Sequence, residues 1–349
     1  MMGVWNSPEF DNHEQVCYFS DEDTGLKAIV AIHSTARGPA AGGTRFKAYD
    51  SDEQALDDAL RLSRAMSYKS ALAGLPVGGG KSVIIGDPAL VKSRDLLHAY
   101  GRFIDRIGQY YATGEDVGIS VADIEVVNEV TPFVGGTSSG TGDPSIPTAI
   151  GVMHGLRAVI HRKFGKDDFD GLRVAVQGLG AVGWAIAERL HEAGAHLVVA
   201  DIRVDQVQRA SDRFGAAISN PDDIHKAQVD IYAPCALGGT INETTAHEIR
   251  AWAVAGSANN QLASARSGEI LASRGILFAP DYVINAGGII SGLEATNSMP
   301  GRSKVKFAPL EQSLAAIHER LLEIFERSAL ENRPPEVAAE EMARELIGR

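Results

Sequence analysis

The sequence predicts an α/β protein of two domains: an N-terminal α/β domain and a doubly wound domain of Rossmann type, with a cleft between them. With 349 residues the chain exceeds one ordinary hydrophobic core. From about residue 148 to 290, helix and strand patterns alternate, which is typical of a parallel sheet. The Gly- and Ser-rich stretch 135–147 predicts a boundary and a hinge. The expected domains are 1–143 and 144–325, with the helices of about 326–349 packing back on the first.

The first third of the chain contains both strands and helices. Residues 16–19 and 26–33 are strand-like, and the Asp- and Gly-containing turn between them predicts a hairpin. A helix is expected after Ser51, with Gln54 three residues on as in a capping box, because apolar residues then recur at helical spacing. Two further helices are expected, one after Ser93 and one over 121–130.

Short apolar runs in the second half predict further strands of the parallel sheet, at 229–234, 252–256 and 275–280. Loops of small polar residues follow them: CALGG, SANNQ and NAGG. Ligands bind at the carboxyl ends of strands in such sheets, so we expect these loops to line a ligand cleft. The segments Leu310–Glu331 and Glu336–Ile347 are amphipathic, and we expect helices that serve packing and assembly.

A glycine signature lies at the start of this second domain. The strand-like run 173–176 leads into Gly178, Gly180 and Gly183, a helical pattern follows, and a second strand ends at Asp201. Strand, GxGxxG turn, helix, strand and acid in this order form the dinucleotide-binding fingerprint. The glycines permit the tight turn and the close approach of a pyrophosphate, and the helix N-terminus offers N–H donors for its charge.

The acid at the end of the second strand predicts which dinucleotide binds. Asp201 would accept hydrogen bonds from both hydroxyls of the adenosine ribose and repel a 2′-phosphate, which favours NAD over NADP. Arg203, two residues later, is a cation that would act in the opposite direction.

A second glycine-rich stretch, GLPVGGGKS at 74–82, lies between strand- and helix-like segments of the first domain. It is not a phosphate loop, because that motif needs a glycine six residues before its lysine, where Leu75 stands here, and β-rich residues follow Lys81 instead of a helix. Glycines let a backbone approach a ligand closely. With Lys69 twelve residues earlier, we interpret the stretch as a lysine site; a glycine-rich turn with two solvated lysines is the alternative.

Composition excludes several classes of partner. The formal net charge is −12 and no basic run gathers a phosphate-binding patch, which argues against nucleic acid. No apolar run approaches the ~18 residues that span a bilayer, and the acidic N-terminus lacks the pattern of a signal peptide. We expect a soluble, cytoplasmic protein. Cys17 and Cys235 form neither a disulfide framework nor a zinc site, so no metal is expected and each is interpreted as a small buried residue.

A dinucleotide domain joined to a domain with two lysines suggests hydride transfer on an anionic substrate. One lysine can anchor a carboxylate, and the other can act as a base if burial and like charges lower its pKa. The segment 111–118, YATGEDVG, supplies a carboxylate partner, Asp116; its neighbour Glu115 is expected to be solvated.

The chain resembles the Glu/Leu/Phe/Val (amino-acid) dehydrogenase family over nearly its whole length, most closely the leucine and phenylalanine dehydrogenase branch. The segments that carry the resemblance are GPAAGGTR (38–45), MSYKSALAGLPVGGGKSVIIGDP (66–88), TGEDVG (113–118), VQGLGAVG (176–183), APCALGG (233–239), AGSANNQ (255–261) and APDYVINAGG (279–288).

The resemblance implies a role for each matching residue. Lys69 would hold the substrate carboxylate with backbone N–H groups at Gly42 and Gly43, Lys81 would activate the attacking water, and Asp116 would exchange protons with the departing amine. Asn259 would lie by the substrate. Thr148 and the 234–237 loop would lie by the nicotinamide. The implied cofactor-binding residues are Gly178, Gly180, Ala181, Val182, Gly183, Asp201, Thr148, Cys235, Ala236 and Asn285.

The implied reaction is reversible oxidative deamination of an L-amino acid by NAD to a 2-oxo acid, ammonia and NADH. Small-molecule substrates, a homo-oligomer, and no nucleic-acid or membrane partner are expected. A different-class alternative is a non-catalytic NAD-binding sensor. The set of Lys69, Lys81 and Asp116 argues against it, because a protein that only binds has no use for a base.

Four positions bear on which amino acid is preferred. Relatives that take branched aliphatic substrates usually have leucine, alanine and two valines where this chain has Ala41, Gly114, Ile289 and Gly292. Three of the four are smaller here, and a wider pocket favours an aromatic, phenylalanine-like substrate. The alternative is a leucine or valine dehydrogenase whose pocket is refilled by neighbouring residues. Glutamate is disfavoured because these positions offer no cation. The stretch 293–307 departs from the family pattern.

Overall fold

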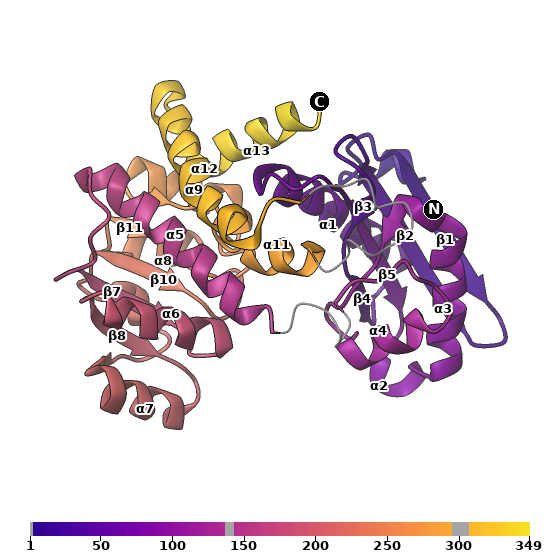
Figure 1. Ribbon diagram of the computed structural model, residues 1–349, viewed down its shortest axis with the longest axis horizontal. Coiled ribbons are helices and arrows are strands. Elements are labelled where there is room, and N and C mark those ends of the chain that lie inside the picture. Colours follow the sequence, from indigo (N-terminus) through magenta and orange to yellow (C-terminus); the bar gives the residue numbers. More distant parts are fainter. Residues whose placement is uncertain (1–2, 137–142, 295–306) are drawn as a thin grey trace. The chain divides into compact units, whose positions relative to one another are not determined.

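A computed structural model of the protein describes residues 3–136, 143–294 and 307–349. The chain folds into two compact units, each built around its own sheet (Figure 1). The first unit comprises residues 1–142, 291–308 and 343–349, and the second comprises 143–290 and 309–342. Part of the expected hinge at 135–147 lies outside the described residues.

The first half of the chain contains six strands and four α-helices within the described residues. They are β1 (Gln15–Asp21), β2 (Leu26–Ser34), β3 (Ala40–Ala41), β4 (Thr44–Lys47), β5 (Gly78–Ile85), β6 (Tyr111–Ala112), α1 (Asp52–Leu72), α2 (Pro88–Val91), α3 (Arg94–Ile107) and α4 (Val121–Asn128).

From residue 143 onward, described strands and helices alternate as far as β12, and the described elements after β12 are all helices. The elements from residue 143 onward are α5 (Ser145–Phe164), β7 (Arg173–Gln177), α6 (Ala181–Glu192), β8 (His196–Ala200), α7 (Val204–Phe214), β9 (Ala217–Ile218), β10 (Ile231–Pro234), α8 (Glu243–Glu248), β11 (Ala253–Val254), α9 (Ala265–Ser273), β12 (Leu277–Phe278), α10 (Asp281–Ile284), α11 (Gly287–Glu294), α12 (Leu310–Glu331) and α13 (Pro335–Leu346).

The sheet of the first unit is mixed. Strands β1 and β2 form the expected antiparallel hairpin, and β2 pairs antiparallel with β5. Strands β3 and β4 both pair parallel with β5, and β6 pairs parallel with β3. Strand β2 is buried along almost its whole length because both faces of the sheet are covered. Ile29 and Ala31 pack with residues of α1, whereas Val30 and Ile32 pack with residues of α3 and α4.

Local capping signals act as expected in this unit, with one difference. Ser51 accepts the backbone N–H of Gln54 at the start of α1, and Ser93 accepts that of Leu96 at the start of α3. The Gln54 amide oxygen accepts the N–H of Asp50 at 3.3 Å, one residue before the cap. The first contact of the predicted capping box therefore forms, while the return contact is shifted by one residue.

The second unit contains the predicted doubly wound sheet. Its strand order is β9-β8-β7-β10-β11-β12, and all of its pairs are parallel. This is the Rossmann order 3-2-1-4-5-6. Successive strands are first added on one side of β7 and then, from β10 onward, on its other side, so the strand order switches between β7 and β10. Ligands bind to such sheets at the carboxyl ends of the strands that flank the switch. The fold therefore directs attention to the loops after β7 and β10.

The last helices differ from the sequence expectation. We predicted that residues of about 326–349 pack back on the first unit, but α12 packs along α5 and belongs to the second unit. The apolar stripe of α12, with Ile317 and Leu321, contacts positions where α5 has Gly151 and Gly155. Only residues 343–349 belong to the first unit.

Two arginines hold these last residues in the first unit. The Arg344 guanidinium lies 3.0 Å from the Asp11 carboxylate, and Arg349 donates to the backbone carbonyl of His33 at 2.8 Å. His33 is completely buried, and its burial, with the nearby Arg349 charge, lowers the pKa of its ring to about 3. Arg349 also lies 2.9 Å from the His33 Nε2 atom, so a neutral ring stands next to a permanent cation.

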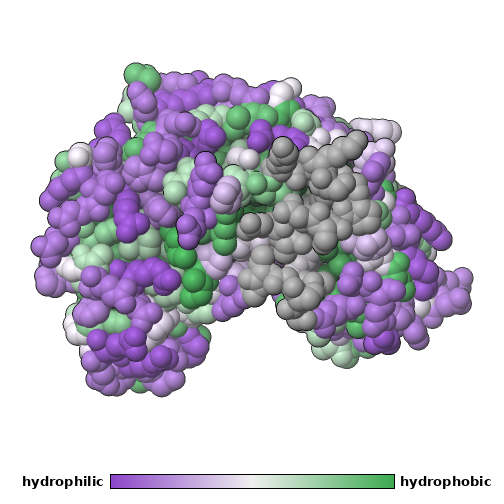
Figure 2. All heavy atoms as spheres, viewed as in Figure 1, coloured by the Kyte–Doolittle hydropathy of each residue, from purple (hydrophilic) through white to green (hydrophobic). Residues whose placement is uncertain are grey.

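The surface agrees with the acidic composition. Hydrophilic side chains cover most of the coloured surface on the face drawn in Figure 2. Within the described ranges, no helix is both long and apolar enough to cross a membrane.

Candidate active site

Lys81 lies inside β5 and is among the few buried charged residues. Its side chain is 9% exposed. Side chains alternate along a strand, so Lys81 shares a face of β5 with Gly79, which packs under Ser67 of α1. Lys69 lies two residues further along α1, in its last turn. The structure thus brings the end of α1 that carries Lys69 over the face of β5 that carries Lys81.

Asp116 reaches Lys81 because the segment 112–118 runs beside β3 and β4. Backbone bonds fix this course: Thr44 N–H donates to Gly114 O at 2.8 Å, and Phe46 N–H donates to Val117 O at 2.8 Å. A Cβ at Gly43 would lie 2.3 Å from Glu115 O and 3.1 Å from the Asp116 Cβ. The absence of a side chain at Gly43 therefore permits the approach, and Glu115 itself stays exposed.

The Lys81 ammonium and the Asp116 carboxylate form an ion pair with a 2.6 Å contact. Burial lowers the pKa of Lys81, and the attraction of Asp116 offsets this only in part. Burial would raise the pKa of Asp116, but Lys81 and then Arg45 outweigh it and hold that pKa below its ordinary value. The site therefore contains an ionised carboxylate next to a lysine that releases its proton more readily than a lysine in water.

Sequence reasoning gave no role to Arg45, although it belongs to the quoted GPAAGGTR segment. Its guanidinium lies 3.3 Å from the Asp116 carboxylate and 3.1 Å from that of Asp58. Asp58 also accepts a hydrogen bond from Tyr49 at 2.8 Å and pairs with Arg61 at 2.7 Å. Arg45 therefore connects Asp116 to a network on α1 that fixes its position. The only sequence signal for this role of Arg45 was that a cationic side chain directly follows GGT.

The glycines before Lys81 do not form a turn or loop. Gly78, Gly79 and Gly80 are buried within β5, and a Cβ at each would lie within 2.0, 2.0 and 2.7 Å of other protein atoms. These atoms belong to Ser34, Ser67 and Tyr111. Both the ligand-approach interpretation and the solvated-turn alternative are therefore wrong for this run. Its glycines let α1 and Tyr111 pack closely on the strand.

One backbone N–H group that was predicted to bind the substrate, that of Gly42, already has a hydrogen-bond partner within the protein. The Gly42 N–H donates to Ala112 O at 3.2 Å, so it is not available to a substrate carboxylate. The Gly42 carbonyl is also used, because it accepts the Tyr111 hydroxyl at 2.6 Å. Gly43, which lies opposite Lys81 in the parallel register, keeps its place next to the ion pair.

The glycine loop of the second unit fits a pyrophosphate. Gly178 has φ +95°, and a Cβ there would lie 2.7 Å from the Ala236 side chain. A Cβ at Gly183 would lie 2.0 Å from Gly178 O, so this glycine allows α6 to pack on the turn. By contrast, no described atom lies within 4 Å of a Cβ at Gly180. Among the described residues no side chain caps α6, which leaves the N–H groups of its first turn, beginning with Ala181 and Val182, for an anion.

Asp201 stands at the end of β8 as predicted, but its oxygens already have partners. One accepts the Leu179 N–H at 2.6 Å, and the other accepts the Arg203 N–H at 2.8 Å. The Arg203 guanidinium also lies over the carboxylate, with a 3.2 Å contact, and donates to Leu179 O at 3.0 Å. These bonds outweigh burial and lower the pKa of Asp201, so the acid is ionised. A ribose would share it with Arg203.

Of the other predicted cofactor residues, Cys235, Ala236 and Asn285 lie in connecting segments of the second unit, and Thr148 lies in the first turn of α5. Cys235 and Ala236 follow β10 directly and lie against the glycine loop. The thiol of Cys235 is free, and burial raises its pKa. The Asn285 amide donates to the Asn259 side-chain oxygen at 2.8 Å, which joins a predicted cofactor residue to a predicted substrate residue. Thr148 lies against Gly287 and Gly288 at the start of α11.

The four positions that bear on substrate size differ in the space around them. Ala41 is buried in β3, 4% exposed. A Cβ at Gly114 would lie 3.2 Å from Gly135 O, whereas no described atom is within 4 Å of a Cβ at Gly292. Ile289 is partly exposed on α11. Of the three small residues, Gly292 therefore leaves the most room. Most of the divergent stretch 293–307 lies outside the described residues.

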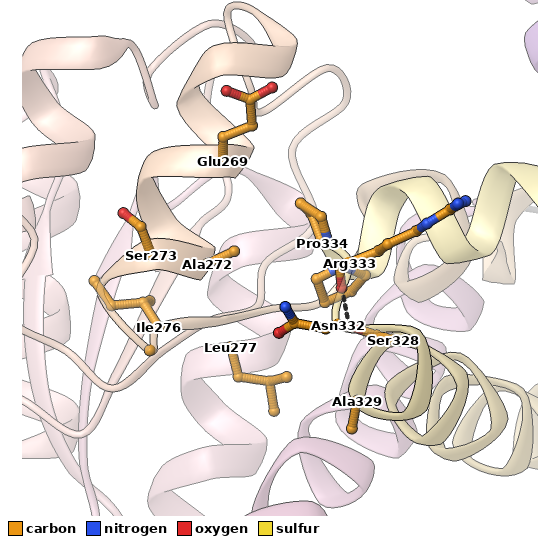
Figure 3. A pocket seen from close by; sticks show the side chains of 12 residues that line it. Glu269, Ala272, Ser273, Ile276, Leu277, Ser328, Ala329, Asn332, Arg333 and Pro334 are labelled. Atoms are coloured by element: carbon orange, nitrogen blue, oxygen red, sulfur yellow. Dashed lines mark hydrogen bonds between the residues drawn. The ribbon is translucent and has the colours of Figure 1, made fainter.

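The second unit also contains a pocket unrelated to these residues. It has a volume of about 510 Å³ and is lined by α9, β12 and the turn between α12 and α13 (Figure 3). Asn332 ends α12 in a left-handed conformation there, and the Ser328 hydroxyl donates to Arg333 O across the turn. None of the predicted site residues lines this pocket.

Comparison with known proteins agrees with this arrangement. Residues 13–133 match the Glu/Leu/Phe/Val dehydrogenase dimerisation domain, and residues 140–344 match the Glutamate/Leucine/Phenylalanine/Valine dehydrogenase domain. The chain belongs to the Glu/Leu/Phe/Val dehydrogenase family. As a member of that family it is an NAD-dependent amino-acid dehydrogenase, an oxidoreductase acting on CH–NH2 groups.

Named relatives within the family cover nearly the whole chain. It is 45% identical to leucine dehydrogenase of Bacillus subtilis, over 100% of this chain and 95% of that protein. It is 42% identical to phenylalanine dehydrogenase of Bacillus thermotolerans, over 97% of this chain and 89% of that protein. The crystal structure of L-tryptophan dehydrogenase from Nostoc punctiforme superposes with a TM-score of 0.87 at 39% identity, covering 97% of this chain and 96% of that one.

Proposed function

We propose that the protein catalyses the reversible oxidative deamination of a neutral L-amino acid to its 2-oxo acid and ammonia, with Lys81 and Asp116 as the catalytic residues. The observation that carries this proposal is the buried ion pair between these residues, in which the pKa of Lys81 is lowered mainly by burial. A buried lysine with a lowered pKa is suited to accept a proton near neutral pH. A protein that only senses NAD would not need such a group.

The proposed roles follow from what each residue can do. Lys69 and the Gly43 N–H hold the substrate carboxylate. When bound, NAD supplies the acceptor for the hydride that leaves the substrate Cα. Asp116, ionised at the start, accepts a proton from the substrate ammonium before hydride transfer and later returns it to the departing nitrogen. Lys81 takes a proton from the water that attacks the resulting imine carbon. Arg45 holds the Asp116 carboxylate in place. The sum is amino acid, NAD+ and water giving 2-oxo acid, ammonium, NADH and a proton.

In the second unit, the N–H groups at Gly180, Ala181 and Val182 would bind the pyrophosphate and Asp201 the adenosine ribose. Thr148, Cys235, Ala236 and Asn285 would surround the nicotinamide, with Asn259 beside the substrate. The bond between Asn285 and Asn259 supports this assignment, because it lets one loop respond to what the other binds.

For the substrate we propose an aromatic, phenylalanine-like amino acid. Ala41, Gly114 and Gly292 provide at most one methyl group each, and none of the residues that the structure describes fills the space beside Gly292. Each further methylene buried gains about 0.8 kcal/mol, so an aromatic side chain would profit from this room. Relatives named phenylalanine and L-tryptophan dehydrogenase support this choice.

A leucine or valine dehydrogenase is the second candidate. Relatives with these names are as similar or slightly more so, at 45% and 44% identity. Two structural observations also favour it: Ala41 is buried, and the carbonyl of Gly135 already lies next to Gly114. These two observations indicate that little extra space for a substrate side chain exists near Ala41 and Gly114.

We also propose a homo-oligomer located in the cytoplasm. The description of the matched N-terminal domain as a dimerisation domain supports assembly. Size-exclusion chromatography with light scattering tests it directly, and a monomer at micromolar concentration would contradict it.

A panel of amino acids, assayed by NADH absorbance, tests the function and the substrate together. Phenylalanine should give a higher kcat/KM than leucine and valine, by up to tens-fold, within the range of ~10–200-fold seen for one missing methylene. The Ala41→Leu/Gly114→Ala double variant should move the ratio towards the aliphatic substrates. A wild type that uses leucine and valine and ignores phenylalanine would favour the second candidate.

Variants of the two lysines test the mechanism. Lys81→Ala should lower kcat by roughly two to four orders of magnitude, the range for a general base, with folding intact. Lys69→Ala should act mainly through KM, because it anchors ground state and transition state alike. Lys226→Ala, which removes an exposed lysine 3.1 Å from Asp223, is the control and should leave both constants near wild type. Near-normal turnover of Lys81→Ala would exclude Lys81 as the base.

A further inference from the structure

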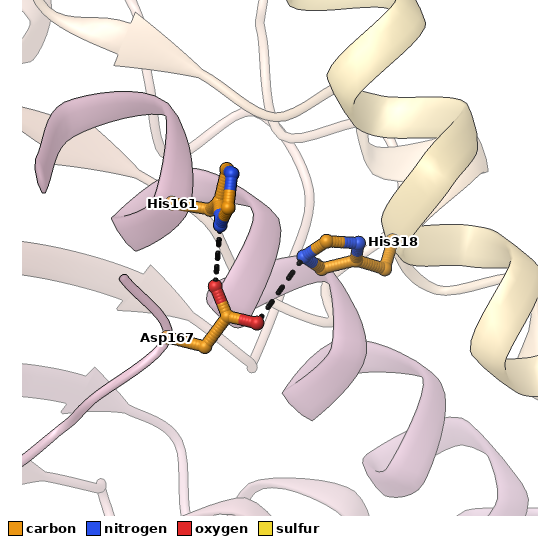
Figure 4. Close-up of side chains that lie close together, drawn as sticks. All are labelled: His161, Asp167 and His318. Atoms are coloured by element: carbon orange, nitrogen blue, oxygen red, sulfur yellow. Dashed lines mark hydrogen bonds and ion pairs between the residues drawn. The ribbon is translucent and has the colours of Figure 1, made fainter. Parts of the chain in front are cut away.

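Two histidines and an aspartate lie together on the second unit, away from the residues discussed so far. They are His161 in the last turn of α5, Asp167 in the loop that follows, and His318 in the middle of α12 (Figure 4). One nitrogen of each ring and a carboxylate oxygen all lie within 4.8 Å of one another. His318 is more than 150 residues from the other two, so no spacing motif in the sequence could have indicated this cluster.

The geometry is that of side chains facing a common point. The Asp167 Oδ1 atom is 2.8 Å from His161 Nδ1, and its Oδ2 atom is 3.8 Å from His318 Nε2. Figure 4 shows the carboxylate between the two rings, with one oxygen towards each. The ring centroids are 5.8 Å apart and nearly perpendicular. The 3.8 Å separation is too long for a hydrogen bond.

The environment of His318 provides an independent indication. Its Nε2 atom is buried and has no hydrogen-bond partner among the described residues. Its other nitrogen, Nδ1, lies 3.0 Å from the Glu319 carboxylate. A carboxylate at Nδ1 keeps the proton there and leaves the Nε2 lone pair free to bind a metal, as in the carboxylate–histidine–metal arrangement of many metal sites. An unpaired buried nitrogen is costly, and a cation would remove that cost.

We propose that His161, Asp167 and His318 bind a divalent transition metal, with Zn2+ as the fitting occupant. A set of two imidazoles and one carboxylate suits Zn2+, whereas Mg2+ and Ca2+ prefer a set made of oxygen ligands alone. Ligand distances of ~2.0–2.2 Å need only small side-chain movements from the present positions. Three protein ligands leave the fourth tetrahedral position to water. The bound ion links α12 to α5 and to the loop after it, and so stabilises the second unit.

The chain offers a matched control. His98 Nε2 lies 2.8 Å from the Glu129 carboxylate, the same distance as in the His161–Asp167 pair, but the second partner of that carboxylate is Arg94 and not a histidine. An arginine cannot bind a metal ion. His98→Ala therefore removes a histidine–carboxylate contact without removing a metal ligand.

Isothermal titration of ZnCl2 into the full chain, stripped with EDTA, tests the proposal. We expect one equivalent bound per chain in wild type and His98→Ala, no comparable binding of MgCl2, and a higher Tm with Zn2+ because the ion binds the folded state. His318→Ala and Asp167→Asn should each lose the equivalent, while Glu319→Gln should weaken it by about 10–100-fold. Asp167→Asn keeps the shape of the side chain, so it covers the case in which His318→Ala misfolds, which circular dichroism would show.

Absence of Zn2+ binding to the wild type would overturn the proposal. So would an equivalent that survives in both Asp167→Asn and His318→Ala, since the ion would then be held elsewhere.

Discussion

The two glycine-rich segments of this chain differ in the space around their glycines. At Gly78, Gly79 and Gly80 a side chain would collide with atoms of the same unit, so these glycines make room for protein. At Gly180 nothing in the described structure fills the space, and we propose that this glycine makes room for a ligand. The difference shows that a glycine run alone does not indicate a ligand loop. What decides is whether the element that follows is a strand or the uncapped start of a helix.

The largest effect should come from filling the first kind of space. A Cβ at Gly79 would lie 2.0 Å from Ser67 N, a backbone atom that cannot move without shifting α1. Overpacking of this kind costs 1–3 kcal/mol in ordinary cores and more against backbone, so we expect Gly79→Ala to lose about 3 kcal/mol or more of stability. Urea denaturation measures it. Gly3→Ala, where no described atom is within 4 Å, is the control.

Unchanged stability of Gly79→Ala would contradict the packing role. The run before Lys81 would then be available for a ligand after all.

A third glycine makes room for a titrating side chain. A Cβ at Gly268 would lie 1.7 Å from the Glu336 carboxyl. Burial, with a contribution from the charges of Glu269 and Asp281, raises the pKa of Glu336 to about 7 from its ordinary value of 4.5. The folded state therefore keeps a proton that the unfolded state loses between pH 4.5 and 7, so stability is greatest below this window and falls as pH rises through it.

The expected loss across the window is at most about 3.5 kcal/mol, because one pKa unit corresponds to ~1.4 kcal/mol. Glu336→Gln should remove this pH dependence, measured as urea midpoints at pH 5 and pH 8, and Glu192→Gln at an exposed position should not. The assignment would be contradicted if the urea midpoints of the wild type and of Glu336→Gln changed in the same way between pH 5 and pH 8.

Filling the space at Gly180 should affect binding and leave folding intact. Its backbone is extended, with φ −65°, so alanine is tolerated there. A methyl group would hold the pyrophosphate away from the N–H groups of α6, and charge-assisted hydrogen bonds are worth ~1.5–3 kcal/mol each. We expect NADH affinity of Gly180→Ala to fall by about 10–100-fold in a fluorescence titration, with an unchanged urea midpoint. Wild-type affinity in this variant would place the pyrophosphate elsewhere.

The smallest expected effect concerns the acid beyond this loop. Asp201→Ser should lower NAD affinity by about tenfold, since one charged hydrogen-bond acceptor is lost. Arg203, released from its contact with Asp201, becomes a partner for a 2′-phosphate, so the preference for NAD over NADP should narrow. A wild type that already prefers NADP would show that Arg203 and not Asp201 selects the cofactor.

Sequence patterns predicted those parts of the molecule that depend on neighbouring residues. The β1–β2 hairpin, the caps at Ser51 and Ser93, the helix Leu310–Glu331 and the alternation of helices and strands in the second unit all follow from short-range periodicity and turn chemistry. The β-rich residues after Lys81 were recognised, but the glycine half of strand β5 was missed because three glycines have no strand propensity. Only the pairing of these glycines with β2 and β3 places them in the strand.

Side-chain partners over long distances were beyond the reach of these patterns. Asp116 was expected as the carboxylate partner of a lysine from the segment 111–118, and the family resemblance agreed. The contact of Arg45 with Asp116 was not expected, because it depends on how β4 lies beside the 112–118 segment. The occupied Gly42 N–H depends on the same contact. The packing of α12 on α5, and with it the placement of His318, depends on small residues at positions 151 and 155. No motif in the sequence indicates that these two glycines contact another helix.

The contacts of Arg344 and Arg349 with the first unit have a consequence for synthesis on the ribosome. Arg344 and its partner Asp11 are 333 residues apart, so the first unit is missing part of its own structure until residue 344 has been added. At ~5–20 residues per second this wait is roughly 15–70 s. During that time Asp11 has Tyr68 as a partner but lacks Arg344, and the His33 carbonyl lacks Arg349. The unit that is translated first is therefore the one that finishes folding last.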